Sequence, residues 1–414
     1  MFRTQCLCCG SGNLHEVINL GMHPMADSFI PKERLANPDA VYALACDFCA
    51  ECGAVQNRTV TSPEERYADT EYSYTSSNSR TARDHWQAYA RRVGGQVGLA
   101  AGDAVVEIGS NDGFLSACFA ESGAAVLGVD ASPVMGKLAR ERGVNTITGF
   151  FNEATLPQIR AQLSRAPKLI VANNVFNHAD DPLGFTKTVQ ALLAPDGTFV
   201  FELPYWAVSV REYKFDMIYH EHVNWLTATY AHHLAARAGL KVVHIEEVDY
   251  HGGSIRVFVQ HQAGTATSLA GQDSWKTYLE QEQKLGLFLP ATYQAYARRI
   301  RQRRDRFLAH VYQLRNQGAA IVCVGAAAKG NTFLNYYNLD SSVIDCVTDA
   351  SPAKLGKATP RTRIPIVPDE ALAKYDSVYA IITSWNLSGP LQAILLKINP
   401  RIQFLNPYSP EYDS

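Results

Sequence analysis

The sequence has no surplus of positive charge and no long hydrophobic run. Its 38 Lys and Arg residues and 40 Asp and Glu residues leave a formal net charge of -2 at pH 7. A protein that binds nucleic acid normally needs basic residues to neutralise phosphates, so we expect no nucleic-acid partner. No apolar run is long enough to span a bilayer, and the opening residues MFRTQCLCCG show no secretion-signal pattern. These absences predict a soluble, cytoplasmic protein with no membrane association.

Cysteine is scarce except near the amino-terminal end, where six of the nine cysteines fall within the first 52 residues. They include the pairs Cys6-x-x-Cys9-Gly and Cys49-x-x-Cys52-Gly. Four thiolates can fill the tetrahedral shell of a zinc ion, and a glycine after each pair permits a tight turn. We therefore predict a structural zinc held by Cys6, Cys9, Cys49 and Cys52, with no open position for a substrate. The alternative is a set of reduced thiols without metal.

A chain of 414 residues is too long for one ordinary core, so we expect two or three domains. Residues 1–60 show little regular pattern. Between residues 104 and 205, apolar strand-like runs alternate with helical stretches, which is typical of a parallel, doubly wound sheet. Residues 241–261 read as two strands around a His-Gly-Gly turn, residues 268–317 as helix, and a second α/β block follows. We predict an α/β protein with modules at 1–70, 71–265 and 266–414.

The segment VVEIGSNDGFL joins a predicted strand to a helix and places Gly109 and Gly113 where a ligand can approach the backbone closely. It matches neither the dinucleotide motif Gly-x-Gly-x-x-Gly nor a phosphate loop. Asp130 lies 23 residues after Glu107, at the end of the next predicted strand. A carboxylate at that position can accept hydrogen bonds from ribose hydroxyls. Another nucleotide-binding doubly wound fold is the alternative.

This combination resembles the S-adenosylmethionine (SAM) site of class I methyltransferases. The resemblance implies that the glycine turn, with Glu107, Gly109, Asn111 and Gly113, holds the amino-acid end of the cofactor, and that Asp130 holds its ribose. It further implies that Phe150, in TGFFNE, lies by the adenine. Asn173, in ANNVFNHADDP, would belong to the loop after the family's fourth strand and contact the cofactor.

The segment IYHEHVNWL, residues 218–226, gathers proton-handling groups between apolar neighbours shortly after the strand that ends in FELPY. Ligands of doubly wound sheets bind at the carboxyl ends of the strands, so this segment can hang over the methyl donor. A carbon next to a ketone becomes a nucleophile when it loses a proton to form an enolate. A His or Glu can take that proton, and Tyr, His or Asn can stabilise the oxyanion.

Nearly the whole chain resembles the sugar-nucleotide C-methyltransferases, a group that includes the mycarose and tetronitrose C-3 methyltransferases. The shared motifs are the two Cys-x-x-Cys-Gly pairs, EYSYTSS, EIGSNDGFL, NNVFNHADDP, IYHEHVNW, HGGSIRV and GAAAKGNTFLNYY. The family's signature Tyr-x-Glu-His falls on Tyr219, Glu221 and His222. The resemblance implies His222 as the base at C-3, with Tyr219 and Glu221 assisting. It also implies that Tyr72 or Tyr74 faces the sugar.

The implied substrate is a dTDP-linked 4-keto-6-deoxy sugar, with C-5 as a possible acceptor in some relatives. The implied architecture is a small zinc-binding module, a class I SAM-methyltransferase sheet, and a helical connector with a Rossmann-like sugar-nucleotide-binding domain. Lys329 and Asn331 begin a predicted helix of that last domain, where amides and a lysine can hold a pyrophosphate. We interpret Lys354 and Lys357 as a solvated face. We expect a monomer or a weak oligomer.

Several readings stay open. Asn177 and His178 line the sugar pocket or merely close their loop, and Asn224 is a further candidate for substrate contact. We expect His220 at the surface; the alternative is a metal pair with His222. As rivals in function we keep a SAM-dependent O- or N-methyltransferase, a zinc-ribbon ligand-binding or interaction protein, and an RNA methyltransferase with a zinc module.

Overall fold

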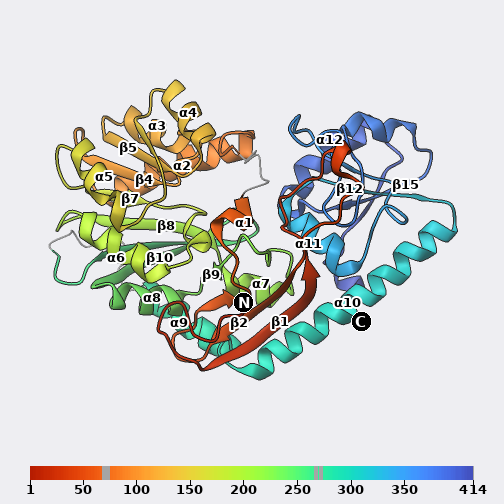
Figure 1. The fold of residues 1–414 in the computed structure, drawn as a ribbon, viewed down its shortest axis with the longest axis horizontal. Coiled ribbons are helices and arrows are strands. Elements are labelled where there is room, and N and C mark those ends of the chain that lie inside the picture. Colours follow the sequence, from red (N-terminus) through yellow and green to blue (C-terminus); the bar gives the residue numbers. More distant parts are fainter. Residues whose placement is uncertain (68–74, 265–268, 270–273, 414) are drawn as a thin grey trace.

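The computed structural model describes residues 1–67, 75–264, 269 and 274–413. Figure 1 shows two α/β lobes side by side, joined along one edge by the amino-terminal strands and by one long helix. Tyr72 and Tyr74 lie outside the described residues. The expected module boundaries, at residues 70/71 and 265/266, also fall beside or within the parts left out, so they stay predictions. No described helix has both the length and the apolar character that a membrane span requires.

The amino-terminal module is built on an antiparallel sheet with strand order β1-β2-β3-β9. Its elements are β1 (Leu14–His23), β2 (Tyr42–Cys49), β3 (Val55–Asn57), β9 (Asn224–Trp225) and the short helix α1 (Pro63–Tyr67). These strands give regular structure to a region whose sequence shows little periodic pattern. The fourth strand, β9, belongs to the predicted catalytic segment and not to the first 70 residues.

The middle lobe contains a seven-stranded sheet with strand order β10-β11-β8-β7-β4-β5-β6. Its strands are β4 (Ala104–Ile108), β5 (Ala125–Asp130), β6 (Thr146–Thr148), β7 (Leu169–Val171), β8 (Thr198–Pro204), β10 (Leu240–Val248) and β11 (Ser254–His261). Strands β4 to β8 run parallel, and β11 and β10 add an antiparallel edge pair. The predicted parallel sheet and the His-Gly-Gly edge pair are therefore confirmed.

Helices cover both faces of this sheet, so every residue of β4 is buried. The helices of the lobe are α2 (Arg80–Gln96), α3 (Phe114–Glu121), α4 (Pro133–Glu141), α5 (Leu156–Gln162), α6 (Pro182–Leu192) and α8 (Ala228–Arg237), and the short α7 (Trp206–Glu212) lies near β9 (Figure 1). Several begin where a polar side chain caps the first turn: Ser132 accepts from the Met135 amide and Asp181 from the Gly184 amide. A proline follows each of these two caps, where its missing N–H costs nothing.

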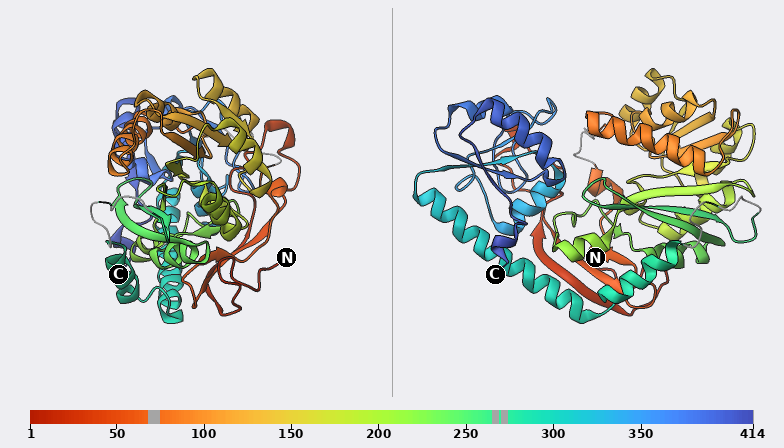
Figure 2. Two further views of the ribbon diagram at one scale, coloured as in Figure 1. Left: turned by 90° about the vertical axis from the view of Figure 1, so that its left-hand side faces the viewer. Right: turned by 180° about the vertical axis from the view of Figure 1, so that it is seen from behind.

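The predicted helix over residues 268–317 is two helices, α9 (Ser274–Leu285) and α10 (Pro290–Asn316). The break follows from Gly286, which has a left-handed φ of 69°, and from Pro290, which lacks an amide hydrogen and starts α10. Helix α10 runs from the middle lobe to the carboxyl-terminal lobe (Figure 2).

The carboxyl-terminal lobe has a five-stranded parallel sheet with strand order β14-β13-β12-β15-β16. Its elements are β12 (Ala320–Val324), β13 (Cys346–Thr348), β14 (Ile366–Val367), β15 (Val378–Ile382), β16 (Gln403–Leu405), α11 (Ala328–Tyr337) and α12 (Ser388–Ile398). This lobe confirms the predicted second α/β block.

Candidate active site and zinc site

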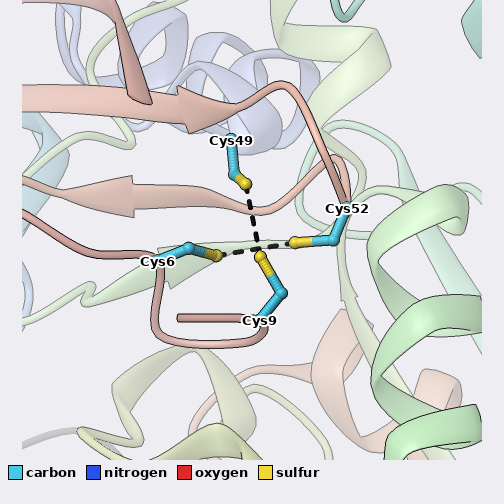
Figure 3. A group of neighbouring side chains, drawn as sticks. All are labelled: Cys6, Cys9, Cys49 and Cys52. Atoms are coloured by element: carbon cyan, nitrogen blue, oxygen red, sulfur yellow. Dashed lines mark hydrogen bonds between the residues drawn. The ribbon is translucent and has the colours of Figure 1, made fainter. Parts of the chain in front are cut away.

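The two cysteine pairs meet, although 39 residues separate them in sequence (Figure 3). The Sγ atoms of Cys6 and Cys52 are 3.5 Å apart, those of Cys9 and Cys49 are 3.6 Å apart, and all four lie within 4.8 Å of one another. Zn–S bonds of about 2.3 Å in a tetrahedron place sulfurs about 3.8 Å apart, so the cluster fits a zinc ion. A bound zinc ion would hold all four cysteines as thiolates.

The glycine turn lies at the carboxyl end of β4. Gly109 and Gly113 have φ angles of 68° and 76°, in the left-handed region that suits glycine. A Cβ on residue 109 would lie 2.1 Å from Cγ2 of Val175, which belongs to the loop after β7. The turn therefore needs glycine for its conformation and for its packing.

Asp130 ends β5 and faces this turn. Its Oδ2 accepts a hydrogen bond from the Asn111 amide and its Oδ1 accepts one from the Ser132 amide, each at 2.8 Å. Burial raises the pKa of Asp130, and the two amides act against that rise. Each carboxylate oxygen has two lone pairs, so the side chain can also accept from ribose hydroxyls.

Glu107 lies deeper in the same site. It is buried and accepts a hydrogen bond from Ser116 Oγ at 2.5 Å. Burial raises the pKa of Glu107 to about 8. A neighbouring ammonium group, such as the amino group of the cofactor, would favour the charged carboxylate.

The other predicted cofactor residues lie around the same strand ends. Phe150 follows β6 and is 56% exposed, which leaves its ring free to meet a planar ligand. Asn173 follows β7, and its Oδ1 accepts from the Glu202 amide at 3.0 Å. Asn111 Oδ1 accepts from the Ser76 amide at 2.8 Å and thereby ties the glycine turn to the EYSYTSS segment.

Tyr219 and His222 form a hydrogen-bonded pair between α7 and α8. The Tyr219 hydroxyl lies 2.7 Å from His222 Nε2, and His222 Nδ1 lies 2.9 Å from the Met217 carbonyl oxygen. Because a carbonyl can only accept, Nδ1 carries the proton and Nε2 accepts from Tyr219. Burial lowers the pKa of His222 well below its ordinary value, because it disfavours the imidazolium, so the resting ring is neutral and its Nε2 carries no proton. His222 is buried and Tyr219 is half-buried in front of it.

The predicted residues Asn177, His178 and Asn224 surround this pair. His178 Nδ1 donates to the Glu221 carbonyl at 2.6 Å, and its ring centroid lies 5.0 Å from that of His222. Asn177 and Asn224 line a small pocket beside His222. Their Oδ1 atoms have no hydrogen-bond partner among the described residues, although the residues are only 5% and 1% exposed. Two buried, unpaired acceptors beside His222 can accept hydrogen bonds from hydroxyl donors.

Glu221 points away from His222, toward the amino-terminal module. Its Oε1 accepts from the Asp27 amide at 3.1 Å, and burial raises its pKa to about 7. The expectation that His220 lies at the surface is wrong. His220 is 1% exposed, and its Nε2 donates to the Ala43 carbonyl of β2 at 3.2 Å. Among the described residues, the four cysteines form the cluster suited to a metal, so a metal pair of His220 and His222 is not supported.

The carboxyl-terminal lobe brings Lys329 to the first turn of α11. Its Nζ donates to Asn386 Oδ1 and lies 4.5 Å from the centroid of the Trp385 ring. Burial lowers the pKa of Lys329 to about 8. Asn331 does not share this environment: it is buried, and its Nδ2 donates to the Ala26 carbonyl at 2.6 Å.

The reading of Lys354 as part of a solvated face needs correction. Its Nζ donates to the Ala326 carbonyl at 2.5 Å and lies 5.1 Å from the centroid of the Phe29 ring. The side chain therefore packs between the carboxyl-terminal lobe and the amino-terminal module.

Two further charged residues, Lys214 and Asp216, lie with Lys329 at the ring of Trp385. Neither was predicted from the sequence as part of a site. Lys214 Nζ lies 3.8 Å from the centroid of the Trp385 ring, and Asp216 Oδ2 accepts from Trp385 Nε1 at 2.6 Å. Both lie shortly before residues 218–226, and a lysine and an aspartate two positions apart are the sequence signal that could have indicated them. They precede Trp385 by about 170 residues, so their contact with it depends on the fold and is not visible in the local sequence.

The glycine turn at the first strand of a doubly wound sheet, and the acid at the end of the second, define a class I SAM-dependent methyltransferase with a zinc-binding module. Three family models match in chain order: "Putative zinc binding domain" over residues 6–67, "Methyltransferase domain" over 80–245, and "C-methyltransferase C-terminal domain" over 249–399.

The C-methyltransferase NovU of Streptomyces niveus is 30% identical over 382 residues, which cover 92% of this chain and 90% of NovU. The chain therefore belongs to the C-methyltransferase family, and its cofactors are SAM and a structural zinc ion. A ubiquinone biosynthesis O-methyltransferase of Haemophilus ducreyi is 29% identical over 101 residues, 23% of this chain and 43% of that protein.

Among solved structures, the magnesium protoporphyrin IX methyltransferase of Synechocystis aligns with 44% of this chain and 83% of its own. Its TM-score is 0.35 at 14% identity, which is too low to bear on function.

Proposed function

We propose that the protein methylates C-3 of a dTDP-linked 4-keto-6-deoxy sugar through an enolate. The Tyr219–His222 pair supports this proposal, because a neutral histidine with a fixed tautomer presents an unprotonated Nε2 to the Tyr219 hydroxyl. O- and N-methylation start from a heteroatom that already has a lone pair. A carbon acceptor must first lose a proton, and this pair offers a route for it.

The cofactor site lies at the carboxyl ends of β4 to β7. Bound SAM supplies an electrophilic methyl group on a positively charged sulfur. Asp130 would accept hydrogen bonds from the ribose hydroxyls, and Glu107 would meet the amino group. Phe150 and Asn173 remain the candidates for the adenine side and for the loop that faces the substrate.

Proton removal would use Tyr219 and His222 in series. The C–H bond of the acceptor carbon breaks, its electron pair delocalises onto the ketone oxygen, and the proton moves to the Tyr219 oxygen as the Tyr219 proton moves to His222 Nε2. The imidazolium that results keeps its Nδ1–H bond to the Met217 carbonyl. The amides of Asn177 and Asn224 and the ring of His178 lie close enough to this pair to position the sugar. That Tyr72 or Tyr74 faces the sugar stays part of this proposal.

The nucleotide end would lie against the carboxyl-terminal lobe. Lys329 and Lys214 place two ammonium groups at the Trp385 ring, and a pyrophosphate needs such compensation. Asn331 supports this region indirectly, because its side chain holds the segment around Ala26.

The test is incubation with SAM and a panel of nucleotide-linked 4-keto sugars, with masses measured and the new methyl located by NMR. We expect a methyl group on C-3. Exchange of the C-3 hydrogen with solvent deuterium, in the presence of S-adenosylhomocysteine, would show the enolate step alone. A methyl group on oxygen or nitrogen, or at C-5, would replace the proposed position. Tight SAM binding without transfer to any sugar would reject the substrate class.

A further inference from the structure

The catalytic segment, residues 218–227, is held by the zinc module as well as by its own lobe. Val55 pairs with Trp225 and Gln56 with Asn224, so β9 is the last strand of the module's sheet. The Asn57 amide donates to the Val223 carbonyl at 2.8 Å. A segment that is remote in sequence therefore completes the module's sheet.

Side chains add to these backbone bonds. His220 Nε2 donates to the Ala43 carbonyl of β2, and Glu221 Oε1 accepts from the Asp27 amide. His220 occupies the variable position of Tyr-x-Glu-His, and its ring faces the module while His222 faces Tyr219. His220 and Glu221, which are consecutive, thus attach the segment to the module, whereas Tyr219 and His222 on either side of them remain for chemistry.

The segment also reaches the metal site itself. Thr227 Oγ1 donates to the Gly53 carbonyl at 3.0 Å, and Gly53 follows the zinc ligand Cys52 directly. Gly53 has a φ of 72°, and a Cβ there would lie 2.7 Å from the Phe288 ring. The turn that presents a zinc ligand is therefore hydrogen-bonded to the end of the segment and packed closely against Phe288.

The opposite side of the segment contacts the other two modules. The Val223 amide donates to the Asn177 carbonyl at 2.8 Å, and His178 donates to the Glu221 carbonyl. Thr332 of α11 donates to the Ile218 carbonyl at 3.1 Å. Because the segment has little secondary structure of its own, its conformation depends on these surroundings.

We propose that the zinc module is a positioning element of the active site: the zinc-held turn and the module's sheet fix residues 218–227, so that Tyr219 and His222 face the acceptor carbon. This inference rests on the proposed function only for the roles of Tyr219 and His222. His220 is the positioning residue that a substitution can address without touching zinc, cofactor or the reacting pair.

The first test compares His220→Phe with His220→Gln in zinc-loaded protein. Phe keeps ring volume but loses the donor to Ala43, whereas the Gln amide can replace it. We expect kcat to fall about tenfold in H220F and less than twofold in H220Q, as loss of one hydrogen bond implies. The dissociation constant for SAM should stay within twofold in both. The exposed His233 of α8 gives the control H233F, which should match the wild type.

Wild-type kcat in H220F, an equal loss in H220F and H220Q, or weakened SAM binding in H220F would each overturn the positioning role.

The second test removes zinc with a chelator, follows metal content by mass spectrometry, and measures amide hydrogen exchange. We expect exchange in residues 218–227 to rise at least tenfold while residues 104–130 change less than twofold, with SAM binding retained. Unchanged protection of 218–227 would overturn the inference, and so would loss of protection throughout the chain.

No sugar is needed for this second readout. If no sugar nucleotide is methylated and zinc loss still exposes residues 218–227, the proposed substrate fails and the positioning role stands.

Discussion

At the scale of single residues, the position of one proton defines the chemistry of His222. The Met217 carbonyl 2.9 Å from Nδ1 fixes the tautomer, so Nε2 is the basic atom. Nε2 accepts a hydrogen bond from the Tyr219 hydroxyl, and Tyr219 is the more exposed residue of the two. In the proposed reaction, a proton from the acceptor carbon would reach His222 by way of Tyr219, and the two side chains should act as one unit.

His222→Gln should lower kcat by about 10²–10⁴, the usual contribution of a general base. Tyr219→Phe should cost a similar factor, and the double variant should lose no more than the worse single one, because residues acting as a unit are not additive. SAM affinity should not change, since the glycine turn and Asp130 lie on other elements. Single-turnover rates and calorimetric titration check both points. Multiplicative losses would show that the two residues act separately.

Glu107 should couple SAM binding to proton release. Burial raises its pKa to about 8 in the cofactor-free protein, so the carboxyl is largely neutral at pH 7. The bound ammonium group favours the ionised form and lowers this pKa, so binding should release a proton and affinity should rise between pH 6 and 7.5. Titrations in buffers with different ionisation enthalpies measure the release.

Two variants separate this effect from titration of the cofactor itself. Glu107→Gln should lose the proton release and the pH dependence of affinity over this range. Asp130→Asn should weaken binding but still release a proton, because Glu107 remains; removal of the Asp130 charge, which raises the pKa of Glu107, should move the release to lower pH. A wild-type protein that binds SAM without proton release at pH 7 would contradict the assignment of Glu107.

At the scale of helices and strands, the local pattern of apolar residues and turn residues predicted most strands of the middle lobe. Strands β4, β5, β7 and β8 were predictable from apolar runs, and the β10–β11 pair from its His-Gly-Gly turn. Gly109 and Asp130 follow from the same pattern, because strand ends of a parallel sheet meet at one edge. The cysteine spacing predicted a cluster that the structure brings together.

What local pattern could not give are contacts between distant segments. The pairing of β9 with β3 joins residues about 170 positions apart, so nothing near Asn224 marks it as a strand of the zinc module. The burial of His220 follows from that pairing. The Lys214, Asp216 and Trp385 cluster was missed for the same reason.

The glycine turn allows a test at this scale. Gly109→Ala would place a Cβ 2.1 Å from Val175 Cγ2 and force a left-handed φ, which alone costs about 1–2 kcal/mol. We expect a lower melting temperature and SAM affinity weakened by at least tenfold. Adding Val175→Ala should restore part of each loss.

The matched control is Gly143→Ala. Gly143 also has a left-handed φ, of 86°, but a Cβ there would have no neighbour within 4 Å. It should lower the melting temperature slightly and leave SAM affinity unchanged. Equal effects of the two substitutions on SAM affinity would mean that close packing at Gly109 is unimportant. Thermal unfolding and titration of SAM measure both.

At the scale of the whole molecule, three modules meet at one short segment. The zinc module pairs with β9, the middle lobe holds Val223 and Glu221, and α11 of the carboxyl-terminal lobe bonds to the Ile218 carbonyl. None of the three contains the whole site. This arrangement gives a physical reason why the three modules belong to one chain. Each module contacts one side of residues 218–227, which have little regular structure of their own.

Trp385 is the residue at which the two lobes meet most directly, and it provides the last prediction. Its indole donates to Asp216 at 2.6 Å, and a Cβ on Gly252 would lie 2.0 Å from its ring. Trp385→Ala should remove the ring contacts that hold Lys214 and Lys329 and should raise KM for the sugar nucleotide about tenfold. The loss of one or two hydrogen-bonded or cation–π contacts has about this size. SAM affinity should not change. Trp385→Phe, which keeps a ring, should fall between. The control is Trp275→Ala, which removes a tryptophan of α9 that stacks on His232. Steady-state kinetics, SAM titration and thermal unfolding test this prediction. A lower melting temperature with an unchanged KM would show that Trp385 only packs the lobes together and that Lys214, Lys329 and Asp216 do not belong to the substrate site.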